Sequence, residues 1–304
     1  MCSPRTLGRL IVMQGTRARI SVRALVAVLA FGAGLCLPTA ASAQEAPVCI
    51  TGKERLDDGV NHWFGSRHRD SVTGLRGEDR MNGGRGGDFI NGGRNNDVVK
   101  GGAGDDLLCG GRGHDVIYGG GGDDVIYGEE ENDRIIPGPG DDKVLGSAGN
   151  DRILGWGKQG GEIVDAGTDV LNGGFNDDVI EAGGADTLLG YTHDDVLLTR
   201  TPDIAPALMD GGGNDDTIYG SEAADNIRGG ERLSGRDTIY GAGGDDRIYG
   251  DGNDDKLFGQ LGDDQLFGGD GFDLLNGGSG TDTCDGGGLD DRAKDCERRS
   301  SIER

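Results

Sequence analysis

Residues 74–127 read GLRGEDRMN GGRGGDFIN GGRNNDVVK GGAGDDLLC GGRGHDVIY GGGGDDVIY, a run of consecutive nine-residue units. The units share the pattern G-G-x-G-x-D-x-U-x, in which U is a large aliphatic residue. So short a period indicates a chain that grows by stacking one small structural unit on the next. The register can be followed from residue 65 to residue 181, and again without interruption from residue 241 to residue 294.

The eighth position of the unit supplies the predicted core. In an extended segment successive side chains point to opposite faces, so U turns inward while its two neighbours face solvent. The glycines allow a tight reversal, and two units make one coil of about 18 residues. We therefore expect an all-β fold, a parallel β-roll (a right-handed β-helix of nonapeptide repeats) with two facing sheets of very short, three-residue strands. The expected core residues are Val72, Met81, Ile90, Val99, Leu108, Ile117, Ile126, Ile135, Val144, Ile153, Leu171, Ile180, Ile218, Ile227, Ile239, Ile248, Leu257, Leu266 and Leu275.

Aspartate fills the sixth position of all but two of the units. Aspartate is common in turns because its side chain bonds to the backbone, but that preference does not confine it to one position of a repeat. Residues 18 apart would stack on the same edge of the roll, which places Asp106 over Asp124 and Asp124 over Asp142. Bare carboxylates about 4 Å apart repel by roughly 1–4 kcal/mol, depending on the dielectric. Such a column needs a cation.

The unit resembles the RTX, or hemolysin-type, calcium-binding nonapeptide repeat. The resemblance implies that carbonyls of the glycine turn and the sixth-position Asp of one unit bind calcium together with the matching turn two units later. Calcium takes six to eight oxygens, both carboxylate and carbonyl, whereas magnesium sheds its water reluctantly. The expected ligands are Asp79, Asp88, Asp97, Asp106, Asp115, Asp124, Asp133, Asp142, Asp151, Asp216, Asp246, Asp255, Asp264, Asp273 and Asp282. The strongest sites are expected where both turns are intact, at Asp106 with Asp124, Asp115 with Asp133, Asp246 with Asp264, Asp255 with Asp273, and Asp264 with Asp282.

The start of the chain is of another kind. Basic residues precede an apolar run over residues 24–37, which is followed by Ala41-Ser42-Ala43. This pattern predicts a secretory signal peptide cleaved after Ala43, and the run is short for a membrane span. We therefore expect a secreted, extracellular protein whose mature chain has no membrane span, and translation could begin at Met1 or at Met13.

The expected organisation follows from the register. It comprises a signal peptide at 1–43, an N-terminal cap segment at 44–64, a first roll block at 65–181, irregular repeats at 182–240, a second roll block at 241–294 and a C-terminal tail at 295–304. The formal net charge of −24 argues against nucleic acid as a partner. The mature chain keeps four cysteines, and we expect two disulfides, Cys284 with Cys296 and Cys49 with Cys109.

Two further functions remain open from the sequence. Aromatic residues recur at the outward-facing ninth position, and the set is Tyr118, Tyr127, Tyr219, Tyr240, Tyr249, Phe258 and Phe267. Such ladders stabilise sheets, and they could also dock a cell-surface or polysaccharide partner in a structural or adhesive protein. An enzyme with a site in the irregular residues 155–210 is the other possibility. No nucleophile–base pair or zinc spacing stands out there, so we expect a calcium-binding protein and not an enzyme.

Overall fold

The computed structural model describes residues 52–301, except for residues 156, 160–161, 165–166, 184, 200–204, 231–234 and 289–290. The expected signal peptide and Cys49 therefore lie outside the described residues. The description below concerns the unit formed by Ala46–Arg304.

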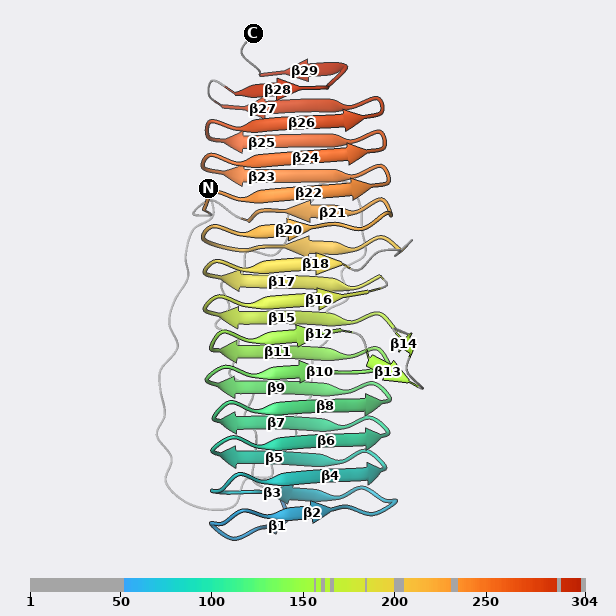
Figure 1. Ribbon diagram of the computed structural model, residues 1–304, viewed down its shortest axis with the longest axis vertical. Coiled ribbons are helices and arrows are strands. Elements are labelled where there is room, and N and C mark those ends of the chain that lie inside the picture. The colour runs from blue at the N-terminus through green and yellow to red at the C-terminus, as the bar shows by residue number, and fades with distance from the viewer. Residues whose placement is uncertain are drawn as a thin grey trace, which may run out of the picture. The chain divides into compact units, whose positions relative to one another are not determined.

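Nearly all strands belong to two parallel sheets whose members alternate along the chain (Figure 1). Sheet A has 14 strands: β1 (Glu54–Arg55), β3 (Ser71–Thr73), β5 (Phe89–Arg94), β7 (Leu107–Arg112), β9 (Val125–Glu130), β11 (Lys143–Ala148), β15 (Val170–Phe175), β17 (Thr187–Thr192), β19 (Leu208–Asp210), β21 (Asn226–Arg228), β23 (Arg247–Gly252), β25 (Gln265–Asp270), β27 (Thr283–Gly287) and β29 (Arg298–Ser300). Sheet B has 13: β2 (His62–Phe64), β4 (Arg80–Arg85), β6 (Val98–Ala103), β8 (Val116–Gly121), β10 (Arg134–Ile136), β12 (Arg152–Leu154), β16 (Val179–Ala182), β18 (Val196–Thr199), β20 (Thr217–Tyr219), β22 (Thr238–Gly243), β24 (Lys256–Leu261), β26 (Leu274–Ser279) and β28 (Arg292–Lys294).

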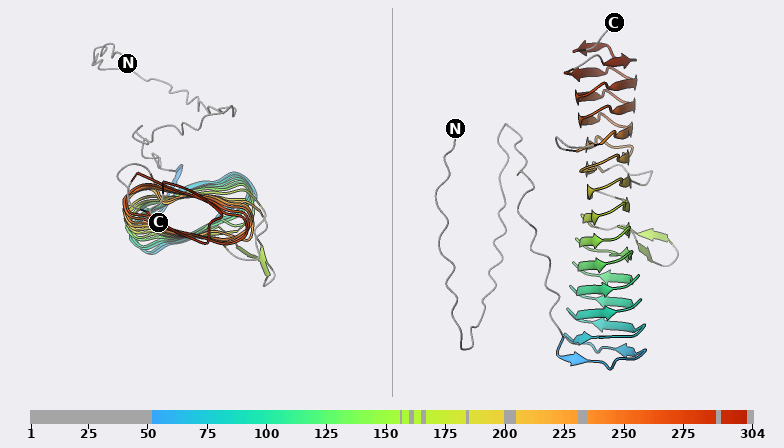
Figure 2. Two further views of the ribbon diagram at one scale, coloured as in Figure 1. Left: turned by 90° about the horizontal axis from the view of Figure 1, so that it is seen from above. Right: turned by 90° about the vertical axis from the view of Figure 1, so that its left-hand side faces the viewer.

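This arrangement confirms the predicted β-roll. Successive coils superimpose when the roll is viewed from above, with the two sheets on opposite sides of a narrow interior (Figure 2). Every expected core residue is buried, with an exposed fraction of 4% or less, and Leu188, Leu197, Met209 and Cys284 join them. Each regular coil thus buries one large side chain from each sheet, and these side chains form two rows along the roll. Among the described residues, the structure has no helix long and apolar enough to cross a membrane.

Many strands are longer than the three residues expected. Strand β6, for example, runs over six residues from Val98 to Ala103 and so includes two glycines of the following unit. Those glycines continue the pairing, with Gly102 opposite Gly120 in β8. The strand therefore ends inside the glycine turn and not before it, because glycine tolerates the extended pairing and the turn alike.

The 18-residue spacing fails where residues leave the roll. Strands β13 (Gly157–Gln159) and β14 (Glu162–Val164) form an antiparallel hairpin beside the stack (Figure 1). Val144 consequently pairs with Leu171, 27 residues further on. The nine-residue phase expected from the sequence is kept here, but the unit at residue 155 forms no coil of the roll. A unit that lacks both the sixth-position Asp and the aliphatic residue has nothing to place in the core, so it is extruded.

The disulfide between Cys284 and Cys296 is present, with Cα atoms 6.0 Å apart. It joins strand β27 to the turn before β29. Cys109 is buried in β7, and its expected partner Cys49 lies outside the described residues. The Cys49–Cys109 pair stays a prediction, which peptide mapping under non-reducing conditions would test.

Candidate metal centre

The sixth-position aspartates form two columns, one along each edge of the roll. Column A consists of the aspartates that precede strands of sheet A, namely Asp70, Asp88, Asp106, Asp124, Asp142, Asp169, Asp186, Asp225, Asp246, Asp264 and Asp282. Column B consists of those that precede strands of sheet B, namely Asp79, Asp97, Asp115, Asp133, Asp151, Asp178, Asp195, Asp216, Asp237, Asp255, Asp273 and Asp291. All of them except Asp70 are buried. Buried acidic groups in such numbers need compensation.

One oxygen of each carboxylate ties its coil to the preceding coil. The backbone N–H of Asp106 donates to Oδ1 of Asp124 at 2.9 Å, and that of Asp246 donates to Oδ1 of Asp264 at 2.9 Å. Bonds of 2.7–3.0 Å repeat this contact through most of both columns. They fix the orientation of each carboxylate, but a single amide donor leaves its negative charge largely uncompensated.

The second oxygen, Oδ2, points into the glycine turn. It is buried without a hydrogen-bond partner at Asp79, Asp88, Asp97, Asp106, Asp115, Asp124, Asp133, Asp151, Asp178, Asp195, Asp216, Asp237, Asp246, Asp255, Asp264, Asp273, Asp282 and Asp291. Native proteins leave few buried polar atoms unpaired, because each one costs the desolvation free energy of the group. A repeated, oriented set of unpaired carboxylate oxygens is therefore what a row of bound cations requires.

The first glycine of each unit brings a carbonyl oxygen to the same place. A Cβ atom added to Gly101 would collide with Oδ2 of Asp106, and it would also meet the carbonyl oxygen of Gly119 in the next coil. Gly241 lies between Oδ2 of Asp246 and the carbonyl of Gly259 in the same way. Carboxylate and carbonyl oxygens from two coils thus converge where only glycine leaves room, and this donor set suits a hard cation such as calcium.

Side chains alone would not complete such a site. Nowhere in the described parts of the chain do three or more His, Cys, Asp or Glu side chains gather in a group that could hold a metal ion. A cation between two coils would therefore depend on backbone carbonyls for much of its coordination shell. This dependence explains why the turns are built from glycine, which exposes its carbonyl without a side chain in the way.

Burial raises the pKa of the column carboxyls. The pKa of Asp133 rises to about 9, mainly through desolvation, with further increases from the negative charges of Asp115 and Asp151. Desolvation likewise raises the pKa of Asp97 and of Asp124 to about 8. The amide hydrogen bond to each carboxylate opposes the rise but does not cancel it. Without a cation, part of each column is therefore protonated near neutral pH.

Without calcium, acidification should stabilise the roll. The ordinary pKa of an aspartate carboxyl is 3.8, and in the folded roll burial raises the pKa to about 6 at Asp106 and to about 9 at Asp133. The contribution of these groups to stability is complete below the ordinary pKa of 3.8, and it is lost as the pH rises through the raised pKa values of the folded roll. Thermal unfolding in chelator, with a stabilising osmolyte added to keep the roll folded, should give a higher Tm at about pH 5 than at about pH 8. A higher Tm at the basic pH would contradict this expectation.

Three places in column A differ from the rest. Oδ2 of Asp70 accepts the N–H of Ser66 at 2.6 Å, and Oδ2 of Asp225 accepts both the N–H and the hydroxyl of Ser221, at 2.6 and 2.9 Å. Serine here supplies hydrogen bonds to the oxygen that elsewhere is left for a cation. Between Asp186 and Asp225 the sixth position is occupied by Ala207, whose N–H donates to Oδ1 of Asp225 at 2.7 Å. Column A is therefore interrupted near its middle.

The structure brings every expected ligand into one of the two columns. The five pairs named from the sequence are joined by the Oδ1 bond at 2.8–2.9 Å. Four aspartates outside the expected set share the same geometry: Asp178, Asp195, Asp237 and Asp291. Each of the four fills the sixth position of its unit, and that position was the available signal.

A second row of polar bonds, on the surface, was not foreseen. Fifth-position side chains accept the N–H of the fifth residue in the following coil, as Oδ1 of Asp105 does from Asp123 at 3.1 Å and Oδ1 of Asp263 from Thr281 at 2.8 Å. The direction is opposite to that in the buried columns. The frequent Asp-Asp doublet of the repeat was the available signal, because it supplies one carboxylate to each row.

The family model of the RTX calcium-binding nonapeptide repeat matches residues 57–157, 163–197, 209–231 and 233–293 in overlapping segments. The chain belongs to this family. The RTX matches skip residues 158–162, which lie in the extruded hairpin, and residues 198–208, which include the unit where Ala207 replaces the sixth-position Asp. A search of curated proteins found no relative.

The aromatic ladders of this RTX chain form as expected. Tyr240 stacks on Tyr219 and on Phe258, with ring centroids 5.0 Å apart in both pairs and interplanar angles of 4° and 10°. Tyr249 and Phe267 stack at 4.8 Å. Rings stacked strand on strand cover one another's faces and present their edges to solvent. A sugar ring packs on an exposed aromatic face, so this geometry favours cross-strand stabilisation.

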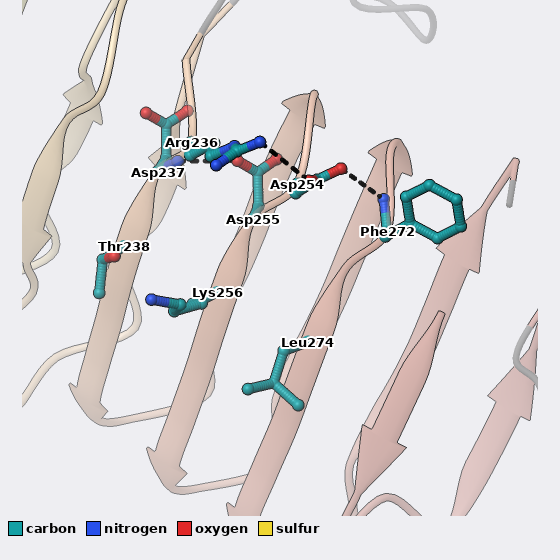
Figure 3. Close-up of a pocket in the computed structure, with 8 residues that line it drawn as sticks. All are labelled: Arg236, Asp237, Thr238, Asp254, Asp255, Lys256, Phe272 and Leu274. Carbon is teal, nitrogen blue, oxygen red and sulfur yellow. Dashed lines mark hydrogen bonds and ion pairs between the residues drawn. The ribbon is translucent and has the colours of Figure 1, made fainter. Parts of the chain in front are cut away.

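A shallow pocket of about 230 Å³ lies on the outside of sheet B, over β22, β24 and β26 (Figure 3). Arg236, Lys256, Phe272 and Leu274 are among the residues that line it. Arg236 is paired with Asp254 at 3.4 Å, and Oδ1 of Asp254 also accepts the N–H of Phe272 at 3.1 Å. The charges of Arg236 and Asp254 are thus paired with each other. The pocket lies outside residues 155–210, the stretch that the sequence left open for an enzyme site.

Proposed function

We propose that this protein is a secreted calcium-binding β-roll whose fold is stabilised by calcium ions stacked along its two edges. The proposed ligands are the column aspartates whose Oδ2 atoms face a glycine turn, together with the turn carbonyls of the same coil and the next. The proposal gives the ions a structural role and includes no catalytic step. Family membership and the repeated donor set support it.

The observation that carries the proposal is the unpaired, buried Oδ2 atom that recurs through both columns. A turn-forming aspartate would use both oxygens for hydrogen bonds, as Asp225 does with Ser221. The column members whose Oδ2 atom is unpaired instead hold Oδ1 in place with an amide and direct Oδ2 into the glycine turn. A divalent cation can take both oxygens as ligands, and it neutralises the charge of the carboxylate.

Two glycines of strand β22 test the proposal. A Cβ on Gly241 would enter the space between Oδ2 of Asp246 and the carbonyl of Gly259, whereas a Cβ on Gly243 would meet nothing closer than 3.6 Å. Gly241→Ala should therefore weaken calcium binding at that turn about tenfold, or about 1.4 kcal/mol, while the Gly243→Ala control stays near wild type. Calcium titration by calorimetry measures both. Equal binding by the two variants would contradict the proposed site.

Secretion rests on the first 43 residues of the sequence, which lie outside the described residues. The basic segment, apolar run and Ala41-Ser42-Ala43 support export and cleavage. Extracellular calcium-binding modules have low affinity for calcium, and extracellular fluid supplies calcium at the concentrations that they need. N-terminal sequencing of exported protein should find Gln44 first, and an intact leader on exported protein would contradict the assignment.

A further inference from the structure

The chain after the last repeat continues the roll. Strand β29 pairs with β27, although residues 295–304 contain no nonapeptide. The last coil of sheet A is shorter than the others, since Cys284 lies opposite Arg299, only 15 residues away. The tail thus completes a coil with a different sequence, and its residues take over places that the repeat fills elsewhere.

Glu297 occupies the place of the next column-A aspartate. In the interior of the column, the N–H of Asp264 donates to Oδ1 of Asp282 at 2.9 Å. At the end of the column, the N–H of Asp282 donates to Oε2 of Glu297 at 2.6 Å. The extra methylene of glutamate lets a carboxylate reach this position from a coil that is three residues shorter.

A carbonyl oxygen of the tail also lies beside Oδ2 of Asp282, as carbonyl oxygens do beside the interior aspartates. At Gly259, Oδ2 of Asp264 converges with the carbonyl of Gly277 from the next coil. At Gly277, Oδ2 of Asp282 converges in the same way with the carbonyl of Asp295. Asp282 is fully buried, and its Oδ2 atom has no hydrogen-bond partner. The end of column A therefore offers the same donors as its interior.

The tail is held in this position by covalent and polar contacts. Cys296, next to Glu297, is bonded to Cys284 in β27. Arg299 donates from Nε to the carbonyl of Cys296 at 3.0 Å. Asp295 has a φ of 50°, and its carboxylate pairs with Lys294 at 3.0 Å, so the side chain of Asp295 is engaged outside the site while its carbonyl faces Gly277.

We infer that Glu297, the carbonyl of Asp295 and Oδ2 of Asp282 form a terminal calcium site that the nonapeptide motif does not encode. The inference rests on the proposed function. The Cys284–Cys296 disulfide positions Glu297 and so links the stability of this last site to the oxidised state of the pair. Because Glu297 is exposed while the interior aspartates are buried, the terminal site is the weakest of column A and the first to empty.

Calcium stoichiometry of the full mature chain, measured by native mass spectrometry at saturating calcium, tests this inference. Glu297→Gln keeps the hydrogen-bond acceptor but removes the charge, so we expect it to bind one ion fewer than wild type. Asp295→Asn is the matched control, because it also removes one acidic side chain but keeps the carbonyl, and we expect no ion to be lost. Undiminished binding by Glu297→Gln would overturn the inference and leave the proposed function standing. A wild-type chain that binds no calcium would overturn both.

Hydrogen exchange gives a second, local measurement. With calcium present, Glu297→Gln should speed exchange of the Asp282 amide by about tenfold or more, while the Asp264 amide stays protected as in wild type. Reduction of the disulfide should have the same local effect. Equal protection of Asp282 in wild type and variant would overturn the site even if the variant lost stability elsewhere.

Discussion

Removal of calcium at neutral pH should unfold most of the roll. Each regular coil buries one aliphatic side chain from each sheet, and along both edges the roll buries carboxylates with an oxygen that lacks a partner. An unpaired buried charge costs several kcal/mol, which so thin a core offsets poorly. Metal binding then supplies folding free energy directly. Far-UV circular dichroism of the chelated mature protein should show loss of the β signal, and added calcium should restore it.

Magnesium is the control for this experiment. It prefers a compact octahedral shell of about six ligands and keeps its water, so it should restore little structure at the calcium concentration that refolds the chain. Half-recovery with calcium is expected at about 10⁻⁴ to 10⁻³ M, the order typical of extracellular modules. A full β signal in chelator at low ionic strength would show that the column charges do not control folding.

The fold was predictable because one short pattern fixes three things at once. The aliphatic residue at the eighth position sets the core, the glycines set the turns, and their common period sets the stacking. Ile126 and Leu257 lie in opposite halves of the chain, yet both are fully buried in equivalent places. Patterns of this kind are reliable where local and tertiary preferences agree in every unit.

The departures arise where the pattern is weak. Nothing in a nine-residue count indicates that residues after Gly155 leave the roll as a hairpin, because phase is preserved when a whole unit is removed. The role of Glu297 was hidden for a related reason. A longer side chain on a shorter coil reaches the same place in space, and a motif search compares residue types at fixed spacing.

The residues of the candidate site were predictable, but the separate roles of the two oxygens of each carboxylate were not. The sequence placed Asp106 and Asp124 on one edge. It did not indicate that Oδ1 of Asp124 holds the preceding coil while Oδ2 faces the turn. That distinction depends on side-chain orientation, and it is what separates the ordinary column members from Asp225, whose Oδ2 is satisfied by serine.

Asp264→Asn should have opposite effects with and without calcium. Asparagine keeps an acceptor for the Asp246 N–H, which Oδ1 of Asp264 accepts at 2.9 Å, but it removes the charge. With calcium, loss of this interior ligand should cost about 3 kcal/mol. For a chain of this size that corresponds to a Tm lower by roughly 6–12 °C. In chelator at neutral pH the same change should raise stability, because burial raises the pKa of Asp264 to about 6 and the ionised group opposes folding.

Asp291→Asn is the matched control, since Asp291 is the last aspartate of column B, and its Oδ1 accepts the Asp273 N–H at 2.9 Å. Stability in a stacked repeat is approximately a sum of nearest-neighbour terms, so an end position contributes fewer of them. We therefore expect the same pair of opposite shifts in Tm, each clearly smaller than for Asp264. Thermal unfolding of both variants with calcium, and in chelator with a stabilising osmolyte that keeps the roll folded, measures all four shifts. If Asp264→Asn lowered the Tm in chelator as much as in calcium, its carboxylate would act through hydrogen bonds alone, and a cation between the coils would no longer be needed to explain the columns.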